Sequence, residues 1–255
     1  MKKISLAAFL VLFSFNVSAK INSNSVKQTL TTKLEKQFTR NLAKNEMKKL
    51  KDHILQLKGK SVPALISVMK NDKYPDKNRW MATFLLGQIM GKKSAPFISK
   101  FSKHPNWVMR MASLKTLLAL KQDKYTDVYS SLLKDNSMIV RYQALETIKK
   151  LEITSLSANV WAMLYDKKNY HLGKDKKKKK RTHIIKNVIR TIGDLKFNKA
   201  KKPLLSMIQK KKYVDIHEDI DYALSKILDR KSPDDGLQRK RRYWRKIALS
   251  ETVIR

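Results

Sequence analysis

The chain has 255 residues, of which 42% are hydrophobic and 31% charged, and it contains no cysteine. The lack of cysteine excludes disulfide bonds, thiol catalysis and cysteine-ligated metal sites, and only six glycines and six prolines argue against a β-rich or disordered chain. With 57 lysines and arginines against 21 acidic residues, the formal net charge is +36. This excess predicts an anionic partner. The alternative is a lysine-rich background that covers every solvated face.

Residues 1–19 have the composition of a secretory signal peptide. Two lysines are followed by an apolar stretch from Ile4 to Phe15 and by small residues up to Ala19. The alternative, a membrane anchor, needs about 20 apolar residues, and this stretch is shorter. We therefore expect cleavage after Ala19, a mature net charge of +34 (36 minus the two lysines) and a periplasmic or secreted location. No later apolar stretch is long enough to predict a transmembrane segment.

Apolar residues between positions 20 and 58 recur at helical spacing. They occupy every fourth position from Val26 to Leu42 and every third or fourth position from Met47 to Leu57. A spacing of four advances about 40° per step around a helix, so the segment is either two helices or one helix with a winding apolar stripe. We expect it to end at a C-capping Gly59 and to form a helical cap on the first repeat.

From Ser61 onward, one unit of two helices is repeated about five times. A small or apolar residue marks the centre of each second helix, at Ala82, Ala112, Ala144, Val188 and Ala223. The expected first helices are Val62 to Met69, Ala95 to Phe101, Val128 to Leu133, Val160 to Leu164 and Lys202 to Ile208. Three of these have proline as their second residue (Pro63, Pro96 and Pro203), which fits the first helical turn. The expected second helices are Asn78 to Met90, Asn106 to Leu120, Asn136 to Leu151, Arg181 to Leu195 and Asp215 to Leu228, with Asn106 and Asp135 as N-caps.

The third unit carries the clearest motif, which consists of Asp135, Val140, Arg141 and Ala144. Together with the paired helices and the opening prolines, this motif resembles HEAT repeats, roughly over residues 61–230. The resemblance implies an all-α fold, a right-handed α-solenoid of about five helix pairs whose second helices line a concave face that binds protein or nucleic acid. The expected organisation is a signal peptide at 1–19, a helical cap at 20–58, the solenoid at 59–230 and a basic tail or capping helix at 231–255.

The other units match the motif unevenly. Arg79 with Ala82 matches in the first unit, whereas Met109 and Ile185 stand where the motif has arginine. Periods near 30 residues are shorter than the usual HEAT unit of about 40. They are similar to the compact HEAT-like repeats named after phycobilin lyases.

The longest insertion lies between the two helices of the fourth unit and is strongly basic. Its candidate anion-binding residues are Lys176, Lys177, Lys178, Lys179, Lys180 and Arg181, and the next helix adds Lys186 and Arg190. The insertion adjoins a helix start, where the helix dipole disfavours cations, so an arriving phosphate or carboxylate would relieve repulsion. The alternative is an idle, solvated loop.

A second basic block lies in the tail. Its candidate anion-binding residues are Arg239, Lys240, Arg241, Arg242 and Arg245, interleaved with Tyr243 and Trp244. Arginine next to aromatic residues suits stacking or interfacial binding. The alternative is a capping helix in which Leu237, Trp244, Ile247 and Ala248 cover the last repeat while the arginines face water.

Two other clusters have plain structural explanations. The acidic cluster Asp215, His217, Glu218, Asp219 and Asp221 suits a helix start better than a metal site, because no second histidine or cysteine group completes a ligand set. Trp80, Trp107 and Trp161 are expected in the core.

These features predict an exported, monomeric, non-enzymatic scaffold that binds an anionic partner and needs no cofactor or metal. Nucleic acid, lipid headgroups, acidic polymers and acidic proteins all qualify as partners, and contact with a membrane surface is compatible with the charge. One alternative is a protein-docking scaffold with incidental basic charge. Another is an enzyme that resembles DNA glycosylases or lyases, but no catalytic motif matches residue by residue.

Overall fold

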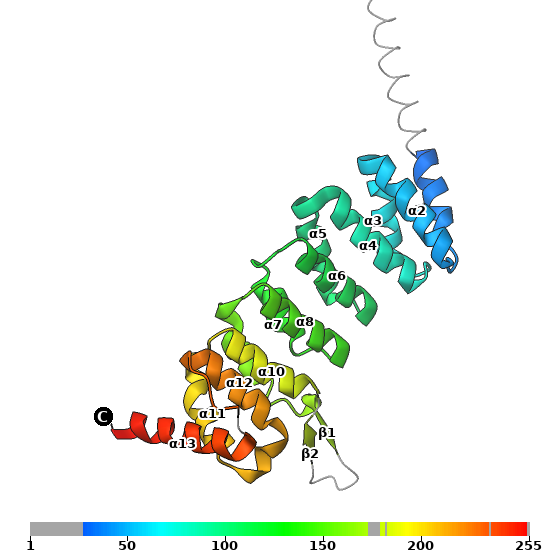
Figure 1. Cartoon of the computed structure of the whole chain (residues 1–255). Helices are drawn as coiled ribbons and strands as arrows, with labels where there is room; N and C mark the ends of the chain where they lie inside the picture. Colours follow the sequence, from blue (N-terminus) through cyan, green and yellow to red (C-terminus); the bar gives the residue numbers. More distant parts are fainter. Residues whose placement is uncertain (1–27, 173–178, 182, 235, 254–255) are drawn as a thin grey trace, which may run out of the picture. The chain divides into compact units, whose positions relative to one another are not determined.

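The computed structural model describes residues 28–172, 179–181, 183–234 and 236–253. The predicted signal peptide therefore lies outside the described residues. The chain forms two compact units, Met1–Ile98 and Ser99–Arg255, which we describe separately. Within the described residues the fold is all-α, built of helix pairs in succession, apart from one small two-stranded sheet (Figure 1). The expected fold class is confirmed.

The first unit begins with the predicted cap, which consists of two helices. Residues 28–37 are helical, and α2 spans Lys44–Leu57. The unit continues with η1 (Lys58–Ser61), α3 (Val62–Lys70), α4 (Asp76–Met90), η2 (Gly91–Ser94) and the start of α5 (Ala95–Ser99). The Asn78 amide of α4 donates to the carbonyl oxygens of Phe38 (2.8 Å) and Arg40 (2.7 Å), which ties the cap to the first pair.

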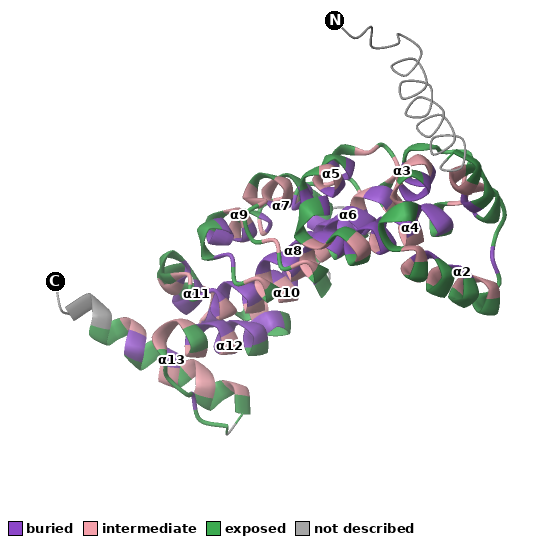
Figure 2. Ribbon diagram, turned by 90° about the horizontal axis from the view of Figure 1, so that it is seen from above, coloured by how far each residue is buried: buried purple, intermediate pink, exposed green. Residues whose placement is uncertain are grey.

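The second unit contains most of the repeat. Its elements are η3 (Lys100–Lys103), α6 (Trp107–Ala119), α7 (Thr126–Leu132), α8 (Met138–Lys150), η4 (Thr154–Leu156), α9 (Ser157–Ala162), η5 (Lys167–Asn169), β1 (Tyr170–Leu172), β2 (Lys179–Arg181), α10 (His183–Asp194), η6 (Asn198–Ala200), α11 (Lys201–Ile208), η7 (Lys211–Ile216), α12 (His217–Leu228) and α13 (Gly236–Val253). Buried residues recur along α8, α10 and α12, where α8 packs on α10 and α10 packs on α12 (Figure 2). The five predicted helix pairs are confirmed, and the predicted prolines lie in or near the first turns of α3, α5 and α11.

The burial pattern of the second helices corrects the predicted register. Arg79, Arg110 and Arg141 each occupy the fourth position of a second helix and lie 31 residues apart. The small residue at the centre of α6 is therefore Ser113, which is fully buried, and the predicted Ala112 is one position too early. The same shift places Arg110 where Met109 had been assigned. Both Ala112 and Ser113 are small, so the sequence pattern could not separate them.

Each of these three arginines donates to carbonyl oxygens at the end of its own pair's first helix or in the following turn. Arg79 donates to Met69 (3.1 Å), and Arg110 donates to the carbonyls of His104 (2.8 Å) and Pro105 (2.7 Å). Carbonyls at helix ends and in turns lack intrahelical partners, and guanidinium groups supply several donors in a fixed plane. The arginines thus hold the first helix of each pair against the second.

Arg110 and Arg141 also reach the next pair. Arg110 forms a two-armed ion pair with Asp135 (2.6 and 2.8 Å), and Arg141 donates to the Lys168 carbonyl (2.8 Å) and to Asn169 Oδ1 (2.7 Å). Asp135 is therefore not the N-cap of α8, which is Ser137. Its carboxylate instead accepts from the Ser137 N–H and from Arg110.

Other local predictions have mixed outcomes. Asn106 is the N-cap of α6, as expected, and accepts a hydrogen bond from the N–H of Val108. Gly59 is not the C-cap of α2, because the helix ends one residue earlier and Lys58 adopts the positive φ. Lysine and glycine can both adopt a positive φ, although glycine does so at a lower cost in free energy.

The prediction that three tryptophans fill the core is wrong. Trp107 is 42% exposed, and Trp80 and Trp161 are only partly buried. The three lie near the ends of helices rather than on the buried stripe, whose positions are filled by leucine, isoleucine and small residues at close packing. The fully buried tryptophan is Trp244 of the tail.

Replacing Arg141 tests the contribution of the buried arginines. Arg141 is 2% exposed, and the substitution Arg141→Met leaves its carbonyl partners without a donor. We expect the free energy of unfolding to fall by about 3 kcal/mol in urea denaturation followed by circular dichroism. Lys150→Met, at an exposed position of the same helix, should have little effect. An equally small effect of both substitutions would show that Arg141 does not stabilise the repeat.

Candidate anion-binding surface

The basic insertion begins and ends in the two-stranded sheet. β2 pairs antiparallel with β1, and Tyr170 lies opposite Arg181. Lys180 is exposed, whereas Lys176, Lys177 and Lys178 lie outside the described residues and, for Lys179 and Arg181, only the backbone is described. The structure thus places the ends of this candidate site beside the start of α10.

The candidate residues on α10 differ in their surroundings. Lys186 is partly exposed. Arg190 forms an ion pair with Asp219 of α12 (3.2 Å), and its guanidinium lies 4.2 Å from the centre of the Tyr222 ring. Both contacts link α10 to α12. The Arg190 guanidinium already contacts a carboxylate and an aromatic ring, so any anion that bound Arg190 would compete with these contacts.

The tail forms α13, which packs on α11 and α12. Trp244 is fully buried, and its indole Nε1 donates to Asp221 Oδ1 (2.7 Å). The Ser232 hydroxyl donates to the same oxygen (2.6 Å), and Ile247 is buried one turn after Trp244. A buried carboxylate is stable only when several donors surround it, and here α13 supplies the Trp244 indole and the Lys240 ammonium. Trp244 and Asp221 therefore anchor α13 to the last helix pair.

Two of the five candidate cations of the tail support this anchor. Lys240 contacts Glu218 (2.9 Å) and Asp221 (3.1 Å), and its hydrogen bond with Glu218 raises the pKa of the Lys240 ammonium above its ordinary value. Arg241 donates to the carbonyl oxygen of Gln209 (2.6 Å), the C-cap of α11. The acidic cluster at the start of α12 thus serves as a docking site for the tail, a role that the sequence analysis did not foresee.

The other three candidate cations of the tail are exposed and share one face of α13 with the exposed Lys246. We define the cationic stripe as Arg239, Arg242, Arg245 and Lys246. At 3.6 residues per turn, positions spaced by three and four lie on one side of a helix, and Trp244 and Ile247 lie on the other. Docking of the buried face therefore orients the stripe toward solvent.

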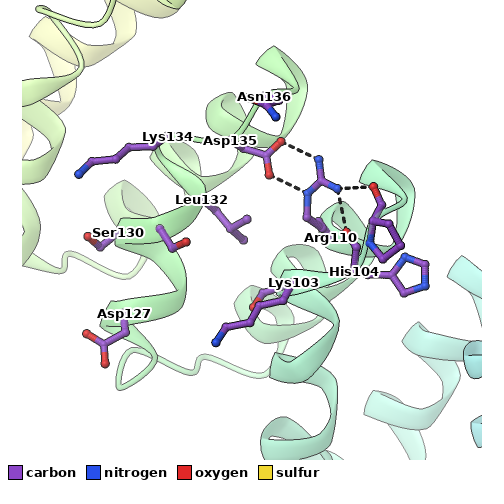
Figure 3. A pocket seen from close by; sticks show the side chains of 12 residues that line it. Lys103, His104, Arg110, Asp127, Ser130, Leu132, Lys134, Asp135 and Asn136 are labelled. Atoms are coloured by element: carbon purple, nitrogen blue, oxygen red, sulfur yellow. Dashed lines mark hydrogen bonds and ion pairs between the residues drawn. The ribbon is translucent and has the colours of Figure 1, made fainter.

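A polar groove of about 940 Å³ lies between the turn before α6 and the helix α7 (Figure 3). Lys103 and Lys134 on its walls are exposed, and Asp127 and Ser130 also line it. Arg110 lies on the wall with its guanidinium directed at Asp135. The groove can therefore bind polar or charged groups through its lysines while Arg110 holds the pairs together.

Neither a metal centre nor a membrane span is found in the described part of the chain. No group of three or more histidine and acidic side chains there could hold a metal ion. None of the described helices combines the length and the apolar character needed to cross a bilayer.

A protein family model matches part of the chain that contains repeated helix pairs. Residues 62–151, from α3 to α8, match the family model of HEAT repeats. This segment consists of HEAT repeats. It contains all three of the pairs that carry Arg79, Arg110 and Arg141. No curated protein was found to match the chain. HEAT repeats form helical scaffolds for protein interaction, which supports a binding function without defining the partner.

The tail anchor can be tested by proteolysis. Replacing Trp244 with alanine removes both its buried ring and its hydrogen bond to Asp221. We expect α13 to detach and trypsin to cleave it about tenfold faster or more, while circular dichroism shows that the HEAT repeats stay folded. Leu249→Ala removes an exposed apolar side chain of the same helix and should not change cleavage. Equal cleavage rates for the two variants would contradict the anchor.

His217 should make stability depend on pH. Burial is the main reason why the pKa of the His217 imidazole is lowered, the carbonyl of Lys210 opposes this effect, and nearby Arg241 adds to it. Because the folded-state pKa lies below the unfolded value of about 6.5, the unfolded chain binds more protons in acid. The free energy of unfolding should therefore fall as pH drops below about 6.5 and be unaffected by this group above it.

The matched substitutions are His217→Gln and His53→Gln, the latter at an exposed position. Urea denaturation between pH 7.5 and pH 5 should show a weaker pH dependence for His217→Gln than for the unmodified protein. His53→Gln should leave the dependence unchanged. A pH dependence that His217→Gln does not reduce would contradict the assignment.

Proposed function

We propose that the protein is an exported, non-enzymatic HEAT-repeat scaffold that binds an anionic macromolecule through the cationic stripe of α13. The observation that carries this proposal is the division of the tail cations. Lys240 and Arg241 are used to dock the helix, whereas Arg242 and Arg245 are held on its outer face.

The electrostatics of α13 support this proposal. Positions 236–250 contain no acidic residue, and the full chain carries a net charge of +36. Cations on a fixed helix face produce a concentrated positive potential that speeds encounter with an anionic surface. Arginine suits this role because its planar group can bind carboxylates and phosphates with two hydrogen bonds.

Export rests on the signal-like composition of residues 1–19. Outside the cytoplasm the accessible anions are lipid headgroups, acidic wall polymers and acidic proteins. Among these we favour an acidic protein surface, because HEAT repeats usually mediate protein interactions. The basic residues at 176–181 are included in the proposal for their charge, and 176–178 lie outside the described residues.

The experiment compares two variants with the same loss of charge. Arg239→Gln/Arg242→Gln/Arg245→Gln removes three cations of the stripe, and Lys44→Gln/Lys48→Gln/Lys49→Gln removes three exposed cations of α2. Polyglutamate, duplex DNA and phosphatidylglycerol vesicles serve as probes at 50 and 200 mM salt. We expect the stripe variant to lose roughly tenfold in affinity for polyglutamate, and the α2 variant much less.

Binding should also weaken with salt, because the attraction between exposed charges is screened. Equal losses in the two variants would show that only total charge matters and would contradict a role for the stripe. Affinity that does not change with salt would favour a docking scaffold with incidental charge. If the protein bound DNA or vesicles more tightly than polyglutamate, the proposed partner would be nucleic acid or a lipid surface and not an acidic protein.

A further inference from the structure

A second groove, lined mostly by apolar and aromatic side chains, lies between α9 and α11 against α10. Figure 2 shows the ribbons of these three helices. Its volume is about 310 Å³, close to the lower end of the range for ligand pockets. The buried Ile185 and Ile189 of α10 form its floor. We define the aromatic groove by the residues on its walls, which are Trp161, Tyr165, Tyr170 and Tyr213.

The register of the repeat explains why the floor is apolar. Ile185 lies 44 residues after Arg141, the same offset that separates Val188 from Ala144. Arg141 fills the corresponding place in the third pair and sends its guanidinium to the turn carbonyls of its own pair and the next. With isoleucine at this position, the fourth pair has no such polar group there, and an apolar surface remains.

The walls have the composition of protein-binding hot spots. Tyrosine and tryptophan supply large apolar faces with a polar end, and they are enriched where binding energy is concentrated. Tyr165 is 74% exposed, so its ring stands at the rim. The Tyr170 hydroxyl donates to the carbonyl oxygen of Leu164 (2.6 Å), which fixes that ring in place. The Tyr170 wall is therefore ordered before binding, which lowers the entropic cost of binding.

The charge at the groove is positive. Of the groove's lining residues, which all belong to the described part of the chain, only Lys210 is charged. Lys212 lies two residues after Lys210, and its ammonium is 5.1 Å from the centre of the Tyr213 ring. An apolar floor with cations at its edge is complementary to an apolar side chain flanked by acids.

We propose that the aromatic groove receives an apolar side chain from an acidic, extended segment of a partner protein. This inference rests on the proposed function and specifies its partner. A recess with buried isoleucines at its floor fits an inserted side chain, whereas attachment to a bilayer requires apolar groups that protrude. The cationic stripe supplies charge attraction, and the aromatic groove supplies the apolar anchor site.

The experiment selects peptides without assuming a sequence. A displayed library of random 12-residue peptides is panned on the full chain, and enriched peptides are synthesised with a fluorescent label for anisotropy titrations. We expect enriched peptides to combine aspartate or glutamate with a central leucine, isoleucine, phenylalanine or tryptophan. Replacing that central residue with alanine should weaken binding by about tenfold.

The variants locate the binding to the groove. Tyr165→Ala and Lys210→Glu should each weaken binding of the selected peptide by about fivefold or more. The controls are Leu249→Ala and Lys199→Glu, which change an exposed apolar residue and an exposed lysine outside the lining of the groove, and they should have little effect. Circular dichroism checks that each variant is folded.

Three results of the peptide experiment would overturn the inference. They are a library with no enrichment, enriched peptides that lack an apolar anchor, and peptide affinities that Tyr165→Ala does not change. If Tyr165→Ala weakened binding to phosphatidylglycerol vesicles alone, the groove would serve a lipid surface and the inference would also fail. These results are distinct from failure of the proposed function, which is tested by the affinity of the stripe variant for polyglutamate.

Discussion

The repeat depends on buried or largely buried arginine side chains whose guanidinium groups donate to turn carbonyls. A pair of short helices leaves carbonyl oxygens without partners where the first helix ends, and a buried carbonyl without a donor is costly. Arg79, Arg110 and Arg141 meet this need from the same position of three successive second helices. Because Arg110 and Arg141 also contact the following pair, the same side chains set the spacing from one pair to the next.

The last two pairs are held together differently. Their corresponding residues, Ile185 and Ile220, cannot donate, and α10 instead packs very closely on α12. A Cβ atom on Gly193 would lie 2.6 Å from the Cα of Ala223, so only glycine permits this approach. The ion pair between Arg190 and Asp219 strengthens the same contact. Close packing thus replaces the buried arginine, and the apolar floor of the aromatic groove follows from that replacement.

The positions of the helices could be predicted from the sequence, whereas the contacts between them could not. Helix pairs could be predicted because apolar spacing, opening prolines and the repeat period are local properties of the chain. The register failed at Ala112 and Ser113, since either small residue suits the centre of a helix. The burial of Trp244 was only one of two alternatives, because it depends on Asp221, far away in sequence. Opposite charge in the two blocks was the available indication that the tail and the acidic cluster meet.

The anchor of α13 changes what its basic residues can do. A mobile stretch with the same composition would attract anions without orientation, and each bound arginine would lose conformational entropy. In the docked helix, Trp244 and Lys240 contact the buried carboxylate of Asp221, so the remaining cations are ordered before a partner arrives. Charge alone still selects poorly among anions, because any acidic surface satisfies it. Selection among acidic proteins therefore requires a second, apolar contact, and the aromatic groove offers one in the same unit of the chain.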